Sequence, residues 1–249
     1  YDVQGFLKLD GFVAPHEVAQ ANHAIGSTLS ESQPSETLVR EPGHKEIRSI
    51  FAIHRRNDAL GDLCRHSAIW EVGRALLADD LYVHQSRLNL QPAFVGSGFW
   101  WHSDFETWHA EDGMPRPRAL SAVIMCSRNT PSNGPLMVVP GSHKKFVACM
   151  GRQLEANWET SLSEQQYYGT PDLPTIRALA SDGGYHVVTG EPGDVFLFDC
   201  NLLHGSAGNI SHEPRCNAFV VLNAVSNALR QPYNAEGARP EHVATRNEP

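Results

Sequence analysis

The hydrophobic positions of this chain repeat with two periods, a helical one near its start and a strand-like one further along. Apolar side chains recur every three or four positions in residues 15–31 and again in residues 68–77, which predicts two amphipathic helices. In the first stretch these positions include Val18, Ala21 and Ile25, and a proline opens it, as the first turn of a helix allows. We therefore expect helices to precede most of the strands.

Short runs rich in β-branched and aromatic residues follow, separated by Gly, Pro and Asn turns. They lie at residues 81–90, 119–126, 136–139, 185–188, 194–199 and 218–223, with an alternating run before them at residues 5–14. A Glu-Pro-Gly turn at residues 191–193 leads into the strand that we expect to deliver His204. This spacing predicts a mainly β fold with flanking helices and a double-stranded β-helix core, the cupin-like jelly roll.

Two polar stretches interrupt this pattern. Residues 30–48 are predicted to form a loop, either a mobile cover over the site or a surface loop without a function. Residues 147–180 are polar with helical pieces, which fits an insertion between strands. No repeat or domain linker is visible, so we expect residues 1–249 to form a single domain.

The composition narrows the classes of partner. The chain has 249 residues, of which 41% are hydrophobic, enough for a full core. Its formal net charge of −8 argues against nucleic acid or an anionic membrane as a partner, since neither attracts a negative surface.

The cysteines and the start of the chain bear on its location. Five cysteines without a C-x-x-C pair suit free thiols in a reducing cytoplasm better than a disulfide framework or a zinc site. Cys200 precedes His204 by four residues, but we expect packing there rather than thiolate ligation. No apolar run approaches the roughly 18 residues of a membrane span, and no leader opens the chain. We interpret the start at Tyr1 as a truncation, because the first residues already resemble part of a folded element.

The candidate chemistry centres on His102 and Asp104, an H-x-D pair that His204 can complete. Two imidazoles and one carboxylate form the facial set that binds non-haem Fe(II) and leaves positions open for oxygen and a cosubstrate. Thirteen histidines and 28 acidic residues give roughly 1.5 such pairs by chance, and His109 with Glu111 is a second one. The pair alone is therefore weak support for a metal site.

A distal arginine distinguishes the first pair from the second. Arg215 follows His204 by eleven residues. If His204 ends one strand and Arg215 lies in the next antiparallel strand, a loop through Gly208 and Pro214 brings the guanidinium beside the metal, where its planar fork can pair with a carboxylate. The alternative for His102 and His204 is a pair of buried core histidines.

The flanking segments decide between these hypotheses. They are VHQSRLN (83–89), WHSDFETWHAEDGMPR (101–116), NGPLMVVPGSH (133–143), FDCNLLHGSAGNI (198–210) and RPEHVATR (239–246). They closely resemble the ectoine-hydroxylating branch of the phytanoyl-CoA dioxygenase-like family, and the resemblance covers essentially the whole chain. It implies Fe(II)- and 2-oxoglutarate-dependent hydroxylation of ectoine to 5-hydroxyectoine with O2, releasing succinate and CO2.

The resemblance also implies roles for individual residues. The catalytic metal ligands would be His102, Asp104 and His204. The residues binding 2-oxoglutarate would be Arg215, Ser206, Asn89 and Phe99. The residues lining the ectoine pocket would be Gln85, Arg87, Trp108, Phe198 and Phe219. A homodimer is left open.

The chain departs from the family pattern at four positions. Gln91, Ala93, Pro117 and Leu222 stand where a lysine, a glycine, a methionine and an aromatic residue are commoner. A second hypothesis is therefore a related 2-oxoglutarate hydroxylase of another small cyclic amino acid such as proline, with Gln91 and Leu222 marking an altered pocket. The third is a non-enzymatic, cupin-like metal or ligand sensor, against which the complete ligand set and Arg215 weigh.

Strand alternation predicts which neighbouring side chains face the metal. If the segment is extended, Trp100, His102 and Asp104 share one face, while Trp101 and Phe105 pack on the other. We expect Trp108 to lie beyond this strand, free to face the pocket. Gln85 and Arg87 share a face with Asn89, and the alternative for them is an exposed barrel rim. We expect the remaining polar residues to be supporting, loop or surface groups: Glu106, Glu111, Asp112, His84, His143 and His186.

Overall fold

The described part of the chain, residues 1–31, 34–149, 169–181, 183–235 and 237–246 of a computed structural model, contains many short strands and a few helices. The strands are β1 (Phe6–Leu9), β2 (Leu38–Arg40), β3 (Ile47–Phe51), β4 (Leu81–Gln91), β5 (Phe99–His102), β6 (Ala119–Met125), β7 (Leu136–Val138), β8 (His186–Val187), β9 (Val195–Asp199), β10 (His204–Ser206) and β11 (Arg215–Ala224). The α-helices are α1 (Pro15–Glu31), α2 (Ala59–Cys64), α3 (Ser67–Leu77), α4 (Asp104–Asp112) and α6 (Leu173–Ala180). Short 3-10 turns cover Ile53–Arg55, Ser142–Lys144 and Val225–Asn227.

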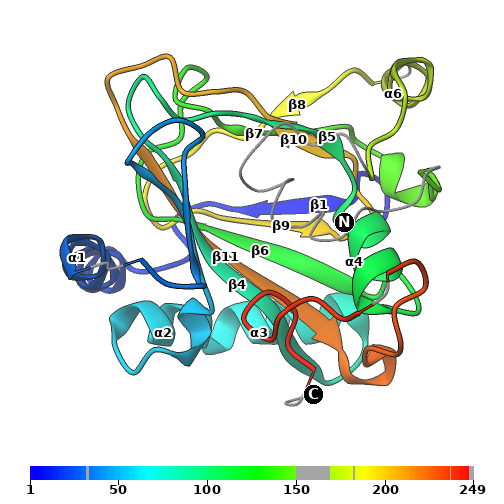
Figure 1. Cartoon of the computed structure of the whole chain (residues 1–249), viewed down its shortest axis with the longest axis horizontal. Coiled ribbons are helices and arrows are strands. Elements are labelled where there is room, and N and C mark those ends of the chain that lie inside the picture. Colours follow the sequence, from blue (N-terminus) through cyan, green and yellow to red (C-terminus); the bar gives the residue numbers. More distant parts are fainter. Residues whose placement is uncertain (32–33, 150–168, 182, 236, 247–249) are drawn as a thin grey trace.

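Two antiparallel sheets lie over one another as a jelly roll (Figure 1). Among the described residues, the larger sheet has seven strands in the order β1-β9-β6-β11-β4-β3-β2, and the smaller has four in the order β5-β10-β7-β8. Helices α2 and α3 lie on the outer side of the larger sheet (Figure 1). The predicted jelly roll with flanking helices is confirmed, and the single domain stays a prediction.

Alternation along the central strands divides the buried side chains between two cores. On β6, Leu120 and Ile124 belong to the cluster shared with α1, α2 and α3, whereas Val123 and Met125 belong to the cluster shared with the smaller sheet. Both faces of this strand are therefore buried. Phe198 belongs to the second of these clusters, and its ring lies 4.9 Å from that of His204, which places an aromatic wall next to a strand end that carries a candidate ligand.

Most predicted elements match observed ones. The two predicted helices correspond to α1 and α3, and the six strand-like runs correspond to β4, β6, β7, β8, β9 and β11. The prediction of a loop over residues 30–48 is wrong in part: residues 34–37 and 41–46 lie outside helices and strands, but β2 and the start of β3 pair there at the edge of the larger sheet. The sequence did not predict this edge because its strands are short and its side chains are polar, including Glu41 and Arg48, which are nevertheless buried.

The predicted insertion at residues 147–180 falls in part outside the described residues. Its last eight positions form α6, where Asp172 accepts a hydrogen bond from the Thr175 backbone as the N-terminal cap. Within the described ranges, no helix has both the length and the apolar composition that crossing a bilayer requires.

Candidate metal centre

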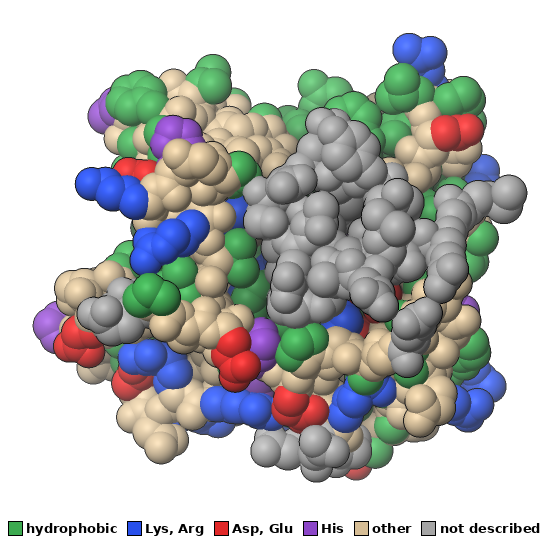
Figure 2. Space-filling view, in the orientation of Figure 1, with side chains coloured by type: hydrophobic (Ala, Val, Ile, Leu, Met, Phe, Trp, Pro, Cys, Tyr) green, Lys and Arg blue, Asp and Glu red, His purple; other side chains and the backbone are tan. Residues whose placement is uncertain are grey.

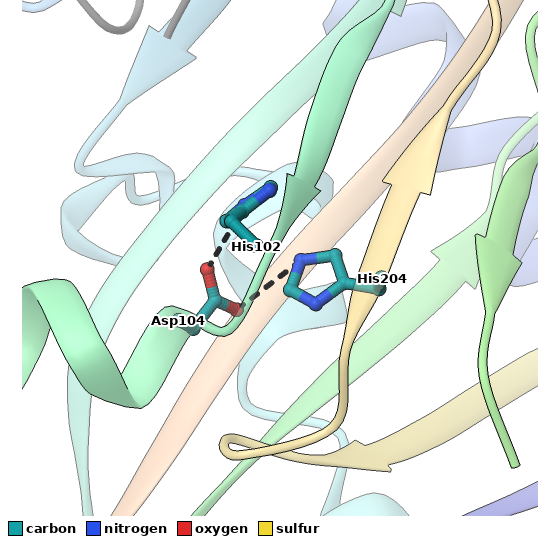
Figure 3. Close-up of side chains that lie close together, drawn as sticks. All are labelled: His102, Asp104 and His204. Carbon is teal, nitrogen blue, oxygen red and sulfur yellow. Dashed lines mark ion pairs between the residues drawn. The ribbon is translucent and has the colours of Figure 1, made fainter. Parts of the chain in front are cut away.

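Three ligand-type side chains meet where β5, α4 and β10 approach one another (Figure 3). His102 ends β5, Asp104 begins α4, and His204 begins β10 in antiparallel register with His102. Nε2 of His102 lies 3.7 Å from Oδ1 of Asp104, and Nε2 of His204 lies 3.8 Å from Oδ2. One ligand atom from each residue lies within 4.8 Å of the others. This spacing suits one ion held on a single face.

Backbone hydrogen bonds fix the tautomer of both imidazoles. Nδ1 of His102 lies 2.6 Å from the carbonyl oxygen of Trp100, and Nδ1 of His204 lies 2.9 Å from that of Leu202. A carbonyl oxygen can only accept, so each Nδ1 carries the proton and each Nε2 presents a lone pair toward Asp104. Burial, reinforced by the neighbouring His204, lowers the pKa of His102 to about 4. His102 is therefore neutral near pH 7, as a metal ligand must be.

The local fold brings Asp104 to the site by a different route from the one predicted. The chain leaves β5 after His102, and Ser103 caps α4 by accepting a hydrogen bond from the Glu106 backbone N–H. The prediction that Trp100, His102 and Asp104 share a strand face is therefore wrong. The Ser-x-x-Glu sequence at residues 103–106 is a helix-start pattern that could have identified this turn. Asp104 also benefits from its position in the first helical turn, where a carboxylate is favoured.

The competing H-x-E pair lies in a different environment. Nδ1 of His109 lies 2.8 Å from the carbonyl oxygen of Met114, and its ring stacks on Tyr233 with centroids 4.2 Å apart. Among the described residues, the group identified as able to hold a metal consists of His102, Asp104 and His204. His109 is thus engaged in packing at the end of α4.

A cavity between the two sheets adjoins the two histidines of the ligand set. It is lined by Arg87, Asn89, Phe99, His102, Leu136, His204, Gly205, Ser206, Arg215 and Phe219. The predicted 2-oxoglutarate residues are therefore all brought together here. Arg215 begins β11 of the larger sheet and faces His204 across the jelly roll, so the guanidinium approaches from the opposite sheet.

The cavity presents an oriented guanidinium. Arg215 is buried, and its Nη2 donates to Oδ1 of Asn89 at 2.9 Å. Its buried Nε has no hydrogen-bond partner among the described residues. Burial lowers the pKa of Arg215 to about 10, and the charges of Arg87 and Arg48 act in the same direction, so the group remains charged near pH 7. A charged donor with an unsatisfied N–H is well suited to a carboxylate ligand.

The residues predicted to line the substrate pocket occupy two settings. Arg87 and Phe219 line the cavity, with the guanidinium carbon 5.2 Å from the ring centroid, and the Phe198 ring lies 4.9 Å from His204. Gln85 instead donates to the Val243 carbonyl at 2.7 Å, outside the lining set. Trp108 on α4 is also outside it, 3% exposed, and its ring lies 4.9 Å from that of His84.

A buried charge network supports this side of the site and was not recognised in the sequence. Nε of Arg239 donates to Oδ1 of Asp112 at 2.7 Å, and Nε2 of His84 lies 3.2 Å from Oδ2. Burial alone would raise the pKa of Asp112, but the charge and hydrogen bonds of Arg239 and the contact with His84 outweigh it and lower the pKa to about 2. The network ties the C-terminal segment to the end of α4, and only a contact map could have paired these distant residues.

We expect Arg239→Met to lower the free energy of unfolding by about 3–5 kcal/mol, because it leaves the Asp112 carboxylate buried without its counter-charge. Chemical denaturation at pH 7 measures this loss. Arg128→Met, which removes an exposed pair with Glu191, is the control and should cause a much smaller change. Equal losses of stability in the two variants would contradict a stabilising role for the buried pair.

The same network predicts how stability depends on pH. Because the pKa of Asp112 is lowered, its stabilising contribution is complete above about pH 4 and is lost as the pH falls through about 2.

A jelly roll with this ligand set defines a class of protein, the non-haem metal oxygenases with two histidines and one carboxylate. Residues 1–217 match the family model of phytanoyl-CoA dioxygenase, and the chain belongs to that family. It is 47% identical over 251 residues to the ectoine dioxygenase of Sphingopyxis alaskensis. The match covers 100% of this chain and 82% of that protein.

Solved structures give the same result. EctD from S. alaskensis with 2-oxoglutarate and 5-hydroxyectoine has a TM-score of 0.87 at 45% identity, covering 100% of this chain and 82% of that one. EctD from S. alaskensis with bound Fe has a TM-score of 0.86 at 45% identity, with the same coverage. The family identified from the sequence segments is confirmed.

Proposed function

We propose that this protein is an Fe(II)- and 2-oxoglutarate-dependent dioxygenase that hydroxylates ectoine to 5-hydroxyectoine and releases succinate and CO2. The observation that carries the proposal is the cluster of His102, Asp104 and His204 next to a cavity that is lined by the buried Arg215. That arrangement stands in a chain whose full length matches a protein crystallised with 2-oxoglutarate and 5-hydroxyectoine.

The donor set fits iron. The free Nε2 atoms of His102 and His204 and the carboxylate of Asp104 would hold Fe(II), and the bound metal would supply oxygen activation coupled to oxidative decarboxylation of 2-oxoglutarate. Arg215 would bind the far carboxylate of 2-oxoglutarate through its fork, while Asn89 fixes the orientation of that fork. Arg215 and Asn89 would therefore orient 2-oxoglutarate within the cavity.

Further residues would complete the cosubstrate and substrate contacts. Ser206 offers a hydroxyl and Phe99 an apolar wall to 2-oxoglutarate, both within the cavity. Ectoine carries a carboxylate and a delocalised cation, so it needs a cationic anchor beside an aromatic surface. Arg87 and Phe219 provide that combination within reach of the metal set. Phe198 adds a second ring beside His204.

Gln85 and Trp108 remain proposed ectoine contacts from the family resemblance. We expect Trp108→Phe to raise the apparent KM for ectoine roughly tenfold, because an indole face binds a delocalised cation better than a phenyl ring. Binding of iron and 2-oxoglutarate should be unchanged, and more succinate should form without hydroxylated product. Kinetics in ectoine with parallel succinate measurement test this. Trp101→Phe, which alters a half-buried ring packed on Tyr185, is the control. A lowered Tm with an unchanged ectoine KM would assign Trp108 to packing alone.

The alternative of an altered pocket for another cyclic amino acid loses its support. Leu222 is fully buried in the core cluster shared with the helices, and Gln91 donates to the Ser97 carbonyl at 2.9 Å. Pro117 is exposed and Ala93 is half-buried, and neither lines the cavity. The four departures from the family pattern therefore lie outside the cavity that adjoins the metal set.

Turnover by the purified protein tests the proposal. Protein loaded anaerobically with Fe(II), 2-oxoglutarate and ectoine, and started with O2, should form succinate and 5-hydroxyectoine in equal amounts. Formation of neither product, with iron and 2-oxoglutarate bound, would overturn the ectoine assignment.

We also propose a cytoplasmic location and a small-molecule substrate as the main partner. All five cysteines lie within the described residues and are free, which suits a reducing compartment. Figure 2 shows acidic and basic side chains interspersed along the lower part of the face in view, a mixture that does not favour a polyanion. A homodimer stays a prediction that the mass in solution would test.

A further inference from the structure

A buried ion pair lies behind the wall of the cavity, outside the metal ligands and outside every residue assigned above to 2-oxoglutarate or ectoine. Arg48 on β3 and Glu41 after β2 are each 2% exposed, with Nη1 of Arg48 3.1 Å from Oε2 of Glu41. Both come from the edge hairpin of the larger sheet (Figure 1). A pair this deeply buried is costly to desolvate and is weak support for stability alone, so its position invites a functional explanation.

The pair holds the loop that leads into β5. Nη1 of Arg48 donates to the Ser97 carbonyl at 2.8 Å, and Nη2 donates to the Gly98 carbonyl at 3.1 Å. Oε2 of Glu41 accepts from the backbone N–H of Ser97 at 3.1 Å and from its hydroxyl at 2.5 Å. Two consecutive residues of the loop are thus fixed by charge-assisted hydrogen bonds.

The same guanidinium supports the aromatic wall. The guanidinium carbon of Arg48 lies 3.8 Å above the ring centroid of Phe99, which lines the cavity. The Phe99 N–H donates to Oγ of Ser206 at 3.2 Å. At Gly98 an added Cβ would lie 2.4 Å from the carbonyl oxygen of Ser206, so the loop and β10 pack backbone to backbone. A shift of the loop would therefore move Phe99 and Ser206 together.

We propose that Arg48, held by Glu41, is a positioning residue for the cosubstrate: it fixes the Phe99 wall and the Ser206 hydroxyl at the spacing that 2-oxoglutarate requires. The inference rests on the proposed function, since it concerns the same cavity. Arg48 itself lies behind Phe99 and is absent from the lining set, so it acts through the ring. Its planar cation stacks on the ring while it donates to two carbonyls, and a lysine ammonium has no planar group that could stack in this way.

The test replaces both members of the pair, Glu41→Gln with Arg48→Met, so that no uncompensated charge stays buried. We expect 2-oxoglutarate to bind the anaerobic Fe(II)-loaded protein roughly tenfold more weakly by titration calorimetry. The apparent KM for 2-oxoglutarate should rise in parallel, while kcat at saturating cosubstrate and the KM for ectoine change less than about twofold. Arg128→Met removes an exposed pair and serves as the matched control.

A double-mutant cycle with Phe99→Leu separates positioning from a general loss of structure. If Arg48 acts through the ring, replacing the pair should weaken 2-oxoglutarate binding little further once Phe99 is leucine. Additive losses in the cycle, or a lowered Tm with unchanged 2-oxoglutarate binding, would overturn the positioning role. Failure of the unaltered protein to bind 2-oxoglutarate would instead overturn the proposed function, so the two failures are distinguishable.

Discussion

Alanine at any one of His102, Asp104 or His204 should reduce hydroxylation by more than roughly 100-fold, the upper range for losing a residue that only supports a metal ligand. Each residue would be one of three protein ligands, and the other two cannot hold iron facially at a solvent-accessible site. The fold should persist, because the three side chains meet at the ends of short elements rather than in either main core. Product formation and iron content after dialysis measure the effect.

His109→Ala is the matched control for the metal centre. It alters the second H-x-E pair, whose histidine contacts Met114 and Tyr233 instead of the ligand set. We expect iron content and 5-hydroxyectoine formation close to those of the unaltered protein. Loss of iron in His109→Ala together with retention of iron in His102→Ala would show that the metal centre has been assigned to the wrong residues.

Replacing Arg215 should give the second largest effect. Arg215→Ala removes a buried cation, and truncating one side of a buried charge pair costs about 2–5 kcal/mol, which corresponds to a rise of roughly 30- to 5000-fold in the KM for 2-oxoglutarate. Arg215→Lys keeps the charge but loses the planar fork. Its KM for 2-oxoglutarate should therefore lie between those of the unaltered protein and Arg215→Ala. The KM for ectoine should change much less in both variants.

Arg87→Lys provides the reciprocal comparison. Both arginines line the cavity, but Arg87 is proposed to bind ectoine and lies over the Phe219 ring. Its variant should raise the KM for ectoine more than that for 2-oxoglutarate. Unchanged 2-oxoglutarate dependence in Arg215→Ala would transfer the role to another basic residue, with Arg87 the first to test.

The sequence predicts well those parts of this protein whose hydrophobic period is long and regular. The α1 pattern of Val18, Ala21 and Ile25 and the apolar run that becomes β6 are expected and observed. The assignment of His102, Asp104 and His204 to one metal site also follows from residue type. That these side chains lie close together could be seen only from the antiparallel register of β5 with β10. Chemistry that depends on residue type could thus be predicted before the geometry was known.

Features that depend on tertiary pairing were not predictable in the same way. The edge hairpin resembles a loop because Glu41 and Arg48 are polar, and polarity normally marks exposure, yet these two residues bury each other. The interpretation of Leu222 as a pocket residue failed because sequence alone does not show which face of β11 turns toward the helices. The helix that carries Asp104 was not predicted, although its capping pattern is present in the sequence. The strand was expected to continue to residue 105, whereas it ends at His102.

The most direct test of the central claim is a comparison of substrates in one assay. Protein loaded anaerobically with Fe(II) and 2-oxoglutarate is offered ectoine or L-proline, the reaction is started with O2, and succinate and hydroxylated product are measured together. We predict that ectoine gives 5-hydroxyectoine with an equal amount of succinate and that L-proline gives little of either product. Efficient hydroxylation of L-proline with ectoine left unchanged would contradict the ectoine assignment and leave only the class of iron oxygenase.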